Sequence, residues 1–277
     1  MDTSWVLKVA LSRLPPERTE KLQSHLQPSL LEKLKKLPSP PEKPKTPLSL
    51  LTLIHWSWFL PPLEHYTKEE QKLFLAILPK QTRNRLNQEI GLPPLPPAAL
   101  KTSVRLFLEK ELICQIGKEI LPPSFLPPSP LNHLLFLSKK EFIQLIDLVS
   151  LFDLMVELKQ IVETKILRKI YSFLSEEEKK FLKTIAPSPP LFPLRWEDWD
   201  GTKESFRHLL HKRGLQKFGF ALAGMEGDLS WYLAHLLDVG RGALLLKASK
   251  LQVPDAAQVE ILSQINAAFS WKTQEEF

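Results

Sequence analysis

The chain has 277 residues, of which 43% are apolar and 25 are prolines, and its formal net charge at neutral pH is +6. This length suggests about two ordinary domains with real hydrophobic cores. Residues 1–130 contain the whole positive excess, with 18 Lys and Arg against 12 Asp and Glu. Because no basic cluster alternates with aromatic residues, the charge is typical of a solvated surface and argues against a nucleic-acid partner.

The cysteine content and the apolar runs favour a cytoplasmic protein. One cysteine, Cys114, excludes an intrachain disulfide, and we expect it to be a small buried side chain. The N-terminus lacks the basic and then apolar pattern of a conventional secretory signal. The longest apolar run, Leu48–Leu60, contains His55 and ends at Pro61, so it predicts a buried core helix and is too short to cross a membrane.

Proline-rich breaks divide the first 130 residues, at 38–47, 91–97 and 121–130. Between the breaks, apolar residues recur at helical spacing. The predicted helices cover residues 3–14, 17–37 with a break at Pro28, 48–60, 68–90 with an interruption at Pro79, and 98–120.

Three capping boxes mark further helix starts, at Thr67–Glu70, Ser138–Glu141 and Ser175–Glu178. Each box precedes apolar residues at helical spacing, and two of the helices then meet a proline, at Pro79 and Pro187. This combination of a capping box and a short apolar helix recurs without a fixed period, which indicates repeated helix–turn–helix packing rather than a regular solenoid.

The C-terminal part starts with a connector rich in proline and tryptophan, residues 187–200. Six of the nine glycines lie within 214–247. Because glycine inside a helix costs about 1 kcal/mol, we expect these glycines to serve tight corners and close helix packing. The predicted helices cover residues 202–213, 214–223, 227–238, 241–250 and 255–270.

No segment alternates as a strand does, so the predicted fold class is all-α. We expect an irregular multi-helix bundle or helical-repeat array in two subdomains joined by proline-rich linkers. The predicted parts are a proline-rich basic helical domain at 1–130, a central helical module at 131–186, and a glycine-punctuated helical module at 187–277.

The sequence offers no positive sign of an enzyme. It has no Gly-x-Ser-x-Gly, His-Glu-x-x-His or phosphate loop, and Gly240–Gly242 follows a predicted helix rather than a strand, as a helix corner does. His208 and His211, like His235 and Asp238, are three residues apart, but a metal site needs three or four converging ligands. We therefore predict no catalytic, cofactor-binding or metal-binding residues.

Aromatic residues are the candidates for binding a partner protein. The turn 196–200 is either anchored on the core by its two tryptophans or exposed for docking, since tryptophan is enriched in interface hot spots. Residues of the predicted helix 227–238 are likewise either core residues or an exposed aromatic patch. The candidate partner-binding residues are Trp196, Trp199, Trp231, Tyr232, His235, Asp238 and Arg241.

Two segments, Leu151–Ile185 and Phe218–Leu246, carry a resemblance to a known family. The first joins a helix, a Lys-x-Leu/Ile-x-x-Ile helix, a Ser-x-Glu-Glu cap and a further helix. The second combines an alanine-rich turn, Gly-Asp, Trp-Tyr-x-x-His-x-Leu-Asp and Gly-Arg-Gly. Together they resemble the cytosolic helical component of chlamydial-type type III secretion systems, and they are distantly similar to the helical repeats of the flagellar rotor switch protein. Leu11–Leu37 resembles the short helices of such repeats.

The resemblance implies a non-enzymatic scaffold or adaptor of the secretion apparatus. Such a protein links the inner-membrane ring to the cytosolic sorting platform, and it is cytoplasmic or held at the inner membrane through the protein complex. The implied partners are protein components of that complex, without a cofactor or small-molecule substrate. Two alternatives remain open: a secreted effector that binds host proteins through extended proline-rich segments, and a basic nucleic-acid-associated helical protein.

Overall fold

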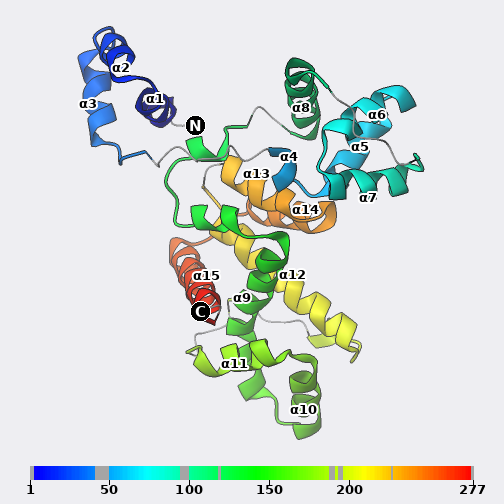
Figure 1. Ribbon diagram of the computed structural model, residues 1–277. Helices are drawn as coiled ribbons and strands as arrows, with labels where there is room; N and C mark the ends of the chain where they lie inside the picture. The colour runs from blue at the N-terminus through cyan, green and yellow to red at the C-terminus, as the bar shows by residue number, and fades with distance from the viewer. Residues whose placement is uncertain are drawn as a thin grey trace. The chain divides into compact units, whose positions relative to one another are not determined.

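The computed structural model describes residues 3–40, 50–93, 100–117, 120–186, 191–192, 196–225 and 227–275. Within these residues every regular element is a helix, which confirms the all-α class (Figure 1). The chain divides into two compact units: Met1–Leu135 with Glu226–Val239, and Phe136–Met225 with Gly240–Phe277.

The first unit is built from short helices. Its elements are α1 (Thr3–Ser12), α2 (Pro16–Gln23), α3 (Pro28–Lys36), α4 (Leu50–Leu53), η1 (Trp56–Phe59), α5 (Leu60–Glu64), α6 (Lys68–Ile77), α7 (Lys80–Ile90), α8 (Thr102–Ile116), η2 (Pro123–Phe125), η3 (Asn132–Phe136) at its boundary, and α13 (Gly227–Leu236). One hydrophobic cluster packs together the helices from α4 to α8, around Phe59, Leu63, Leu75 and Leu112.

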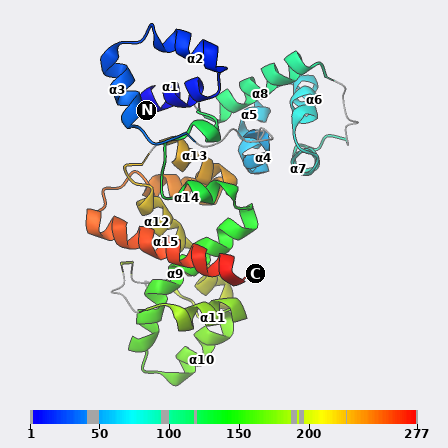
Figure 2. The ribbon, with the colours of Figure 1, turned by 60° about the vertical axis from the view of Figure 1, so that its left-hand side comes forward.

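The second unit has longer helices, and α9, α12 and α15 pack on one another at its centre. Figure 2 shows α15 running beside α9 and α12. The elements are α9 (Lys139–Gln160), α10 (Thr164–Phe173), α11 (Glu176–Thr184), η4 (Trp196–Asp198), α12 (Lys203–Ala221), α14 (Val239–Ala248) and α15 (Asp255–Glu275).

The three predicted capping boxes are present, at the starts of α6, α9 and α11. In each box the Ser or Thr hydroxyl accepts a bond from the N3 amide, and the N3 glutamate accepts one from the N-cap amide. These reciprocal bonds satisfy two amides that a helix start otherwise leaves without a partner.

Two glycines inside α12 allow neighbouring helices to approach it closely. A Cβ on Gly214 would lie 2.2 Å from the carbonyl oxygen of Ile146 on α9, and one on Gly219 would lie 2.3 Å from the Cβ of Ala248 on α14. Because α12 runs as one helix from Lys203 to Ala221, the predicted break between residues 213 and 214 is wrong. These glycines serve close helix packing rather than a corner.

Two further expectations are corrected. Residues 48–60 do not form one core helix, because α4 ends at Leu53 and the His55 side chain caps η1 instead. Cys114 is exposed, since α8 buries the side that carries Leu112 and Ile113.

The compact units differ from the three modules expected from the sequence. The first boundary lies after Leu135 rather than residue 130, and the expected module 187–277 is shared between the two units because α13 belongs to the first. Within the described part of the chain, no helix has both the length and the apolarity to cross a membrane.

Candidate functional site

A buried charge pair joins the central helices of the second unit. Lys217 of α12 and Asp153 of α9 are both fully buried, and Lys217 Nζ donates to Asp153 Oδ1 at 2.8 Å. The ammonium also donates to the carbonyl of Val149 and, at 2.7 Å, to Gln264 Oε1 of α15. Burial lowers the pKa of Lys217 to about 8, and the charge of Asp153 opposes that change. The pair therefore ties three helices together.

A second buried pair lies one turn away. Arg213 Nη1 donates to both carboxylate oxygens of Glu157, at 2.9 and 2.8 Å, and also to the carbonyl of Phe192. The amides of Leu191 and Phe192 in turn donate to Asp153. The two pairs thus fasten residues 191–192 to α9 and α12, and their opposite charges are balanced.

A third ionic cluster connects α9, α11 and α12. Arg207 pairs with Glu178 and with Asp147, and His211 Nδ1 lies 2.7 Å from Asp147 Oδ1. An Asp–His pair takes part in nucleophilic catalysis when a nucleophile bonds to the other ring nitrogen. His211 Nε2 is buried without a hydrogen-bond partner among the described residues. The charged side chains of this cluster join α9, α11 and α12.

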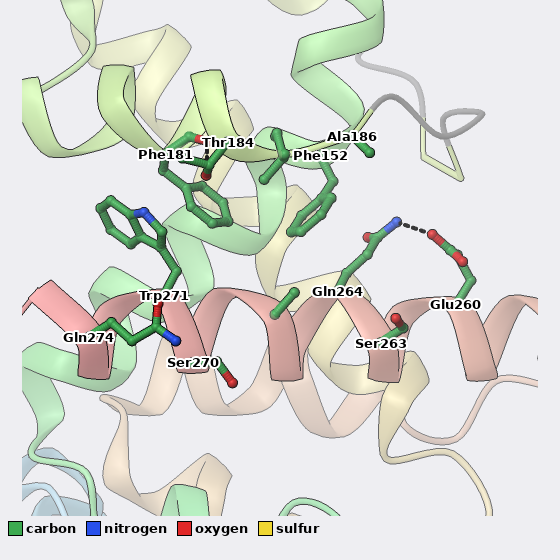
Figure 3. A pocket seen from close by; sticks show the side chains of 12 residues that line it. Phe152, Phe181, Thr184, Ala186, Glu260, Ser263, Gln264, Ser270, Trp271 and Gln274 are labelled. Carbon is green, nitrogen blue, oxygen red and sulfur yellow. Dashed lines mark hydrogen bonds between the residues drawn. The ribbon is translucent and has the colours of Figure 1, made fainter.

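Beside these pairs, the second unit has a groove between α15 on one side and α9 and α11 on the other, with a cavity of about 440 Å³ (Figure 3). Phe152, Phe181 and residues 184–186 form the second wall. The two phenylalanine rings are buried and meet edge to face at 5.6 Å. In Figure 3, the side chains of Trp271 and Gln264 extend from α15 toward these rings. The wall opposite α15 is therefore mainly apolar.

The α15 wall follows a regular spacing. Intervals of three and four residues separate Glu260, Ser263, Ala267, Ser270 and Gln274, which form a seam along one side of the helix. Ser263, Ala267 and Ser270 at its centre are small and exposed. The seam joins residues fourteen apart, or roughly 21 Å at 1.5 Å per residue. We call this surface the α11–α15 groove.

Gln264 links the groove to the buried pair. Its Oε1 accepts from Lys217, and its Nε2 donates to Glu260 Oε1 at 3.0 Å. The charge of Glu260 also acts on Lys217, since it opposes the lowering of the pKa of that ammonium by burial. Glu260 is also the one ionisable residue among the twelve that line the groove.

The two tryptophans of the predicted docking turn lie in the second unit and are half-buried. Trp199 Nε1 donates to the carbonyl of Thr202 at 2.8 Å. The ring of Trp199 lies 5.9 Å from those of Trp196 and of the fully buried Phe206. These contacts favour the interpretation of residues 196–200 as a turn anchored on the core.

Three other candidates, Trp231, Tyr232 and His235, lie on α13 in the first unit. The His235 ring lies between two indoles, 3.8 Å from that of Trp231 and 4.0 Å from that of Trp58. Tyr232 donates to the carbonyl of Leu121, and burial raises the pKa of its phenol. Tyr232 and His235 are only 3% and 2% exposed, so they supply internal contacts.

The last two candidates flank the start of α14. Asp238 lies in the first unit and Arg241 in the second, and both side chains are half-buried and engaged in contacts. The candidates are therefore distributed over both units.

The histidines considered as metal ligands do not belong to a ligand group. His208 is exposed. Within the described ranges, no group of three or more side chains that could ligate a metal comes together.

The fold alone defines the class of this protein, an all-helical chain in two units. No family model, no curated protein and no solved structure matches it.

The sequence did not single out the α11–α15 groove. One signal was present, since residues 255–270 were predicted as helical and Ser263, Ala267 and Ser270 recur on one side of that helix without a charge. The opposite wall comes from residues more than seventy positions earlier, so no local pattern joins the two.

Proposed function

We propose that the protein is a non-enzymatic adaptor that binds another protein along the α11–α15 groove. The observation that carries this proposal is the distribution of charge in the second unit. The charges of Asp153, Glu157, Arg213 and Lys217 are buried and paired, while the neighbouring groove presents small uncharged and apolar side chains. Buried balanced pairs suit a rigid support. A groove with an aromatic side chain and a single carboxylate, Glu260, in an otherwise uncharged lining suits a protein partner.

The assembly that we propose for this adaptor is the cytosolic side of a type III secretion base. The support for this finer statement is the resemblance carried by Leu151–Ile185 and Phe218–Leu246. The first of these segments includes Phe152, Phe181 and Ile185, and so it contributes the second wall of the groove. In this proposal the adaptor acts in the cytoplasm, between the inner-membrane ring and the sorting platform.

Photo-crosslinking in living cells tests the proposal. Benzoylphenylalanine replaces Ser270, which is exposed in the seam, and in a matched control it replaces Ser172, which is exposed on α10 outside the groove. We expect discrete crosslinked species from Ser270 and none from Ser172, and we expect mass spectrometry to identify secretion-base or sorting-platform proteins in them. Equal crosslinking at both positions would contradict the groove as the binding site. Host proteins or ribosomal proteins from Ser270 would contradict the secretion role and favour an alternative.

A further inference from the structure

We infer that the outward side of α10 binds the surface of an anionic membrane. The inference goes beyond the proposed function, because it concerns a surface outside the α11–α15 groove and a different kind of partner. Both ribbon views show α10 at one end of the second unit (Figures 1 and 2). The surface, which we call the α10 surface, consists of Lys159, Val162, Lys165, Arg168, Lys169 and Tyr171.

The sequence of α10 separates its cations from its apolar residues. At 3.6 residues per turn, Lys165, Arg168 and Lys169 share one side of the helix, and all three are exposed. On the other side Ile170 is fully buried, and the ring of Phe173 lies 6.0 Å from that of a buried phenylalanine of α12. The apolar side therefore anchors α10 on the unit, and the basic side faces outward.

The cations of this surface exceed the carboxylates around them. Residues 159–172 contain four cations and one carboxylate, Glu163, so their net charge of +3 is half of the +6 of the chain. Lys159, Lys165 and Arg168 form no ion pair with any residue that the structure describes. An anionic lipid surface attracts such a cluster, with about a fivefold gain in affinity for each cation near the surface.

An acidic turn bounds the α10 surface on one side. Lys169 Nζ lies 5.7 Å from the ring centroid of Trp199, next to the exposed Asp198. Asp200 accepts bonds from the amide and the hydroxyl of Thr202, so its carboxylate is held within the turn itself. Lys169 is therefore shared with this turn, and the charge that is available to a membrane comes mainly from the other three cations.

Two apolar side chains project next to the cations. Val162, in the turn between α9 and α10, is 95% exposed, and Tyr171 is 42% exposed. Tyr171 follows Arg168 by three residues, so the two are neighbours on the helix surface. A valine in water gains free energy when it enters the boundary between headgroups and acyl chains, and the amphipathic ring of tyrosine is enriched there. Nucleic acid presents the negative charge without this apolar layer, so the combination favours a membrane.

Vesicle flotation with the full chain tests the inference. The vesicles contain phosphatidylcholine, alone or with roughly a third of phosphatidylglycerol, in about 0.01 and 0.15 M salt, where the Debye length is about 30 and 8 Å. One variant, Lys165→Gln with Arg168→Gln, removes two cations of the α10 surface. Its control, Lys247→Gln with Lys250→Gln, removes two exposed cations of the same unit at the end of α14 and beyond it. Val162→Ser removes the apolar side chain and keeps every charge.

We expect wild type to bind the phosphatidylglycerol vesicles at least about tenfold more tightly than phosphatidylcholine alone, and more weakly at the higher salt. The α10 double variant should lose about twentyfold to thirtyfold in affinity, from two cations at about fivefold each, and the control double variant at most about threefold. Val162→Ser should lose about twofold to fivefold. Circular dichroism and thermal unfolding establish that each variant is folded.

A spin label measures whether the surface enters the lipid. The label is attached to Val162→Cys in a chain that also has Cys114→Ser, and the control chain has the label on the exposed Cys114. With phosphatidylglycerol vesicles, we expect collisions with oxygen to increase and collisions with a water-soluble nickel chelate to decrease at position 162 only. Equal changes at both positions would contradict docking through α10.

Four further results would overturn the inference: no vesicle binding, equal binding to both compositions, an equal loss in the two double variants, or protein crosslinks in cells from Ser172 on the basic side of α10. The last result would make a protein the occupant. Binding of a single-stranded oligonucleotide that depends on Lys165 and Arg168, without vesicle binding, would assign the surface to nucleic acid. Vesicle binding through α10 without crosslinks from Ser270 would support the inference and count against the proposed function.

Discussion

The imidazole of His235 lies face to face with the indole of Trp231, with ring centroids 3.8 Å apart and planes inclined by 20°. Trp58 closes the other face of the same imidazole at 4.0 Å, and the amide of His55 donates to the carbonyl of His235 at 2.7 Å. Ring contacts and a backbone hydrogen bond thus connect residues near 55 to residues near 235 within the first unit. This arrangement makes α13 an internal part of the first unit.

The His235 stack predicts a loss of stability in acid. Burial lowers the pKa of His235 to about 4, from an ordinary value of 6.5 in the unfolded chain. The unfolded state then binds more protons between these values, so the stability present above pH 6.5 falls as the pH drops toward 4, by up to about 3 kcal/mol. Urea unfolding at pH 7, 5.5 and 4.5, compared between wild type and His235→Phe, measures the effect.

Comparing wild type with His235→Phe isolates the effect of protonating His235. His133, whose pKa is also lowered by burial, titrates in both proteins and cancels in the difference. Parallel pH profiles for wild type and variant would show that His235 contributes nothing to the acid sensitivity.

The pair between Lys217 and Asp153 predicts strong non-additivity. Lys217→Met leaves the carboxylate of Asp153 buried with only the amides of Leu191 and Phe192 as donors, so we expect a loss of about 3–5 kcal/mol in unfolding free energy. Adding Asp153→Asn removes the uncompensated charge, and the double variant should be more stable than Lys217→Met alone. Denaturant unfolding of all four proteins in the cycle provides the coupling energy. A double variant that loses the sum of both single effects would mean that the groups do not interact.

Gly214 predicts a steric effect in the centre of the second unit. Gly214→Ala places a Cβ 2.2 Å from the carbonyl oxygen of Ile146, so α12 must move away from α9 at a cost of at least about 2 kcal/mol. Gly227 at the start of α13 provides the control, because a Cβ there meets nothing within 4 Å. Thermal unfolding should separate the two alanine variants clearly, and a Gly214→Ala protein as stable as Gly227→Ala would refute the close approach.

Trp199 distinguishes an anchored turn from a docking turn. Because its ring packs on Phe206 and Trp196, Trp199→Ala should lower the stability of the second unit by about 2 kcal/mol, less than the usual cost at a fully buried site. Photo-crosslinking from Ser270 in the α11–α15 groove should stay within about twofold of wild type at temperatures where the variant is folded. The opposite pattern, intact stability with lost partner binding, would restore the turn as a docking element.

Helix starts were predictable from the sequence because a capping box is local. Ser138 and Glu141, for example, bond to each other's backbone across three residues, so the pattern contains the whole interaction. The continuity of α12 was not predictable, since the reason for Gly214 is a carbonyl on α9, 68 residues earlier. The membership of α13 in the first unit was not predictable either. The hydrogen bond from the His55 amide to the His235 carbonyl joins residues that are far apart in the sequence.

The membership of α13 in the first unit also has a consequence for how the protein is made. Residues 1–135 leave the ribosome long before Glu226–Val239, and the intervening ninety residues take roughly 5–20 s to translate. During that interval Trp58 lacks both the imidazole of His235 and the carbonyl of Leu237, to which its indole donates at 2.8 Å. A nascent chain of this protein therefore carries an incomplete aromatic core until α13 has been synthesised, and this is the stage at which a chaperone has most to protect.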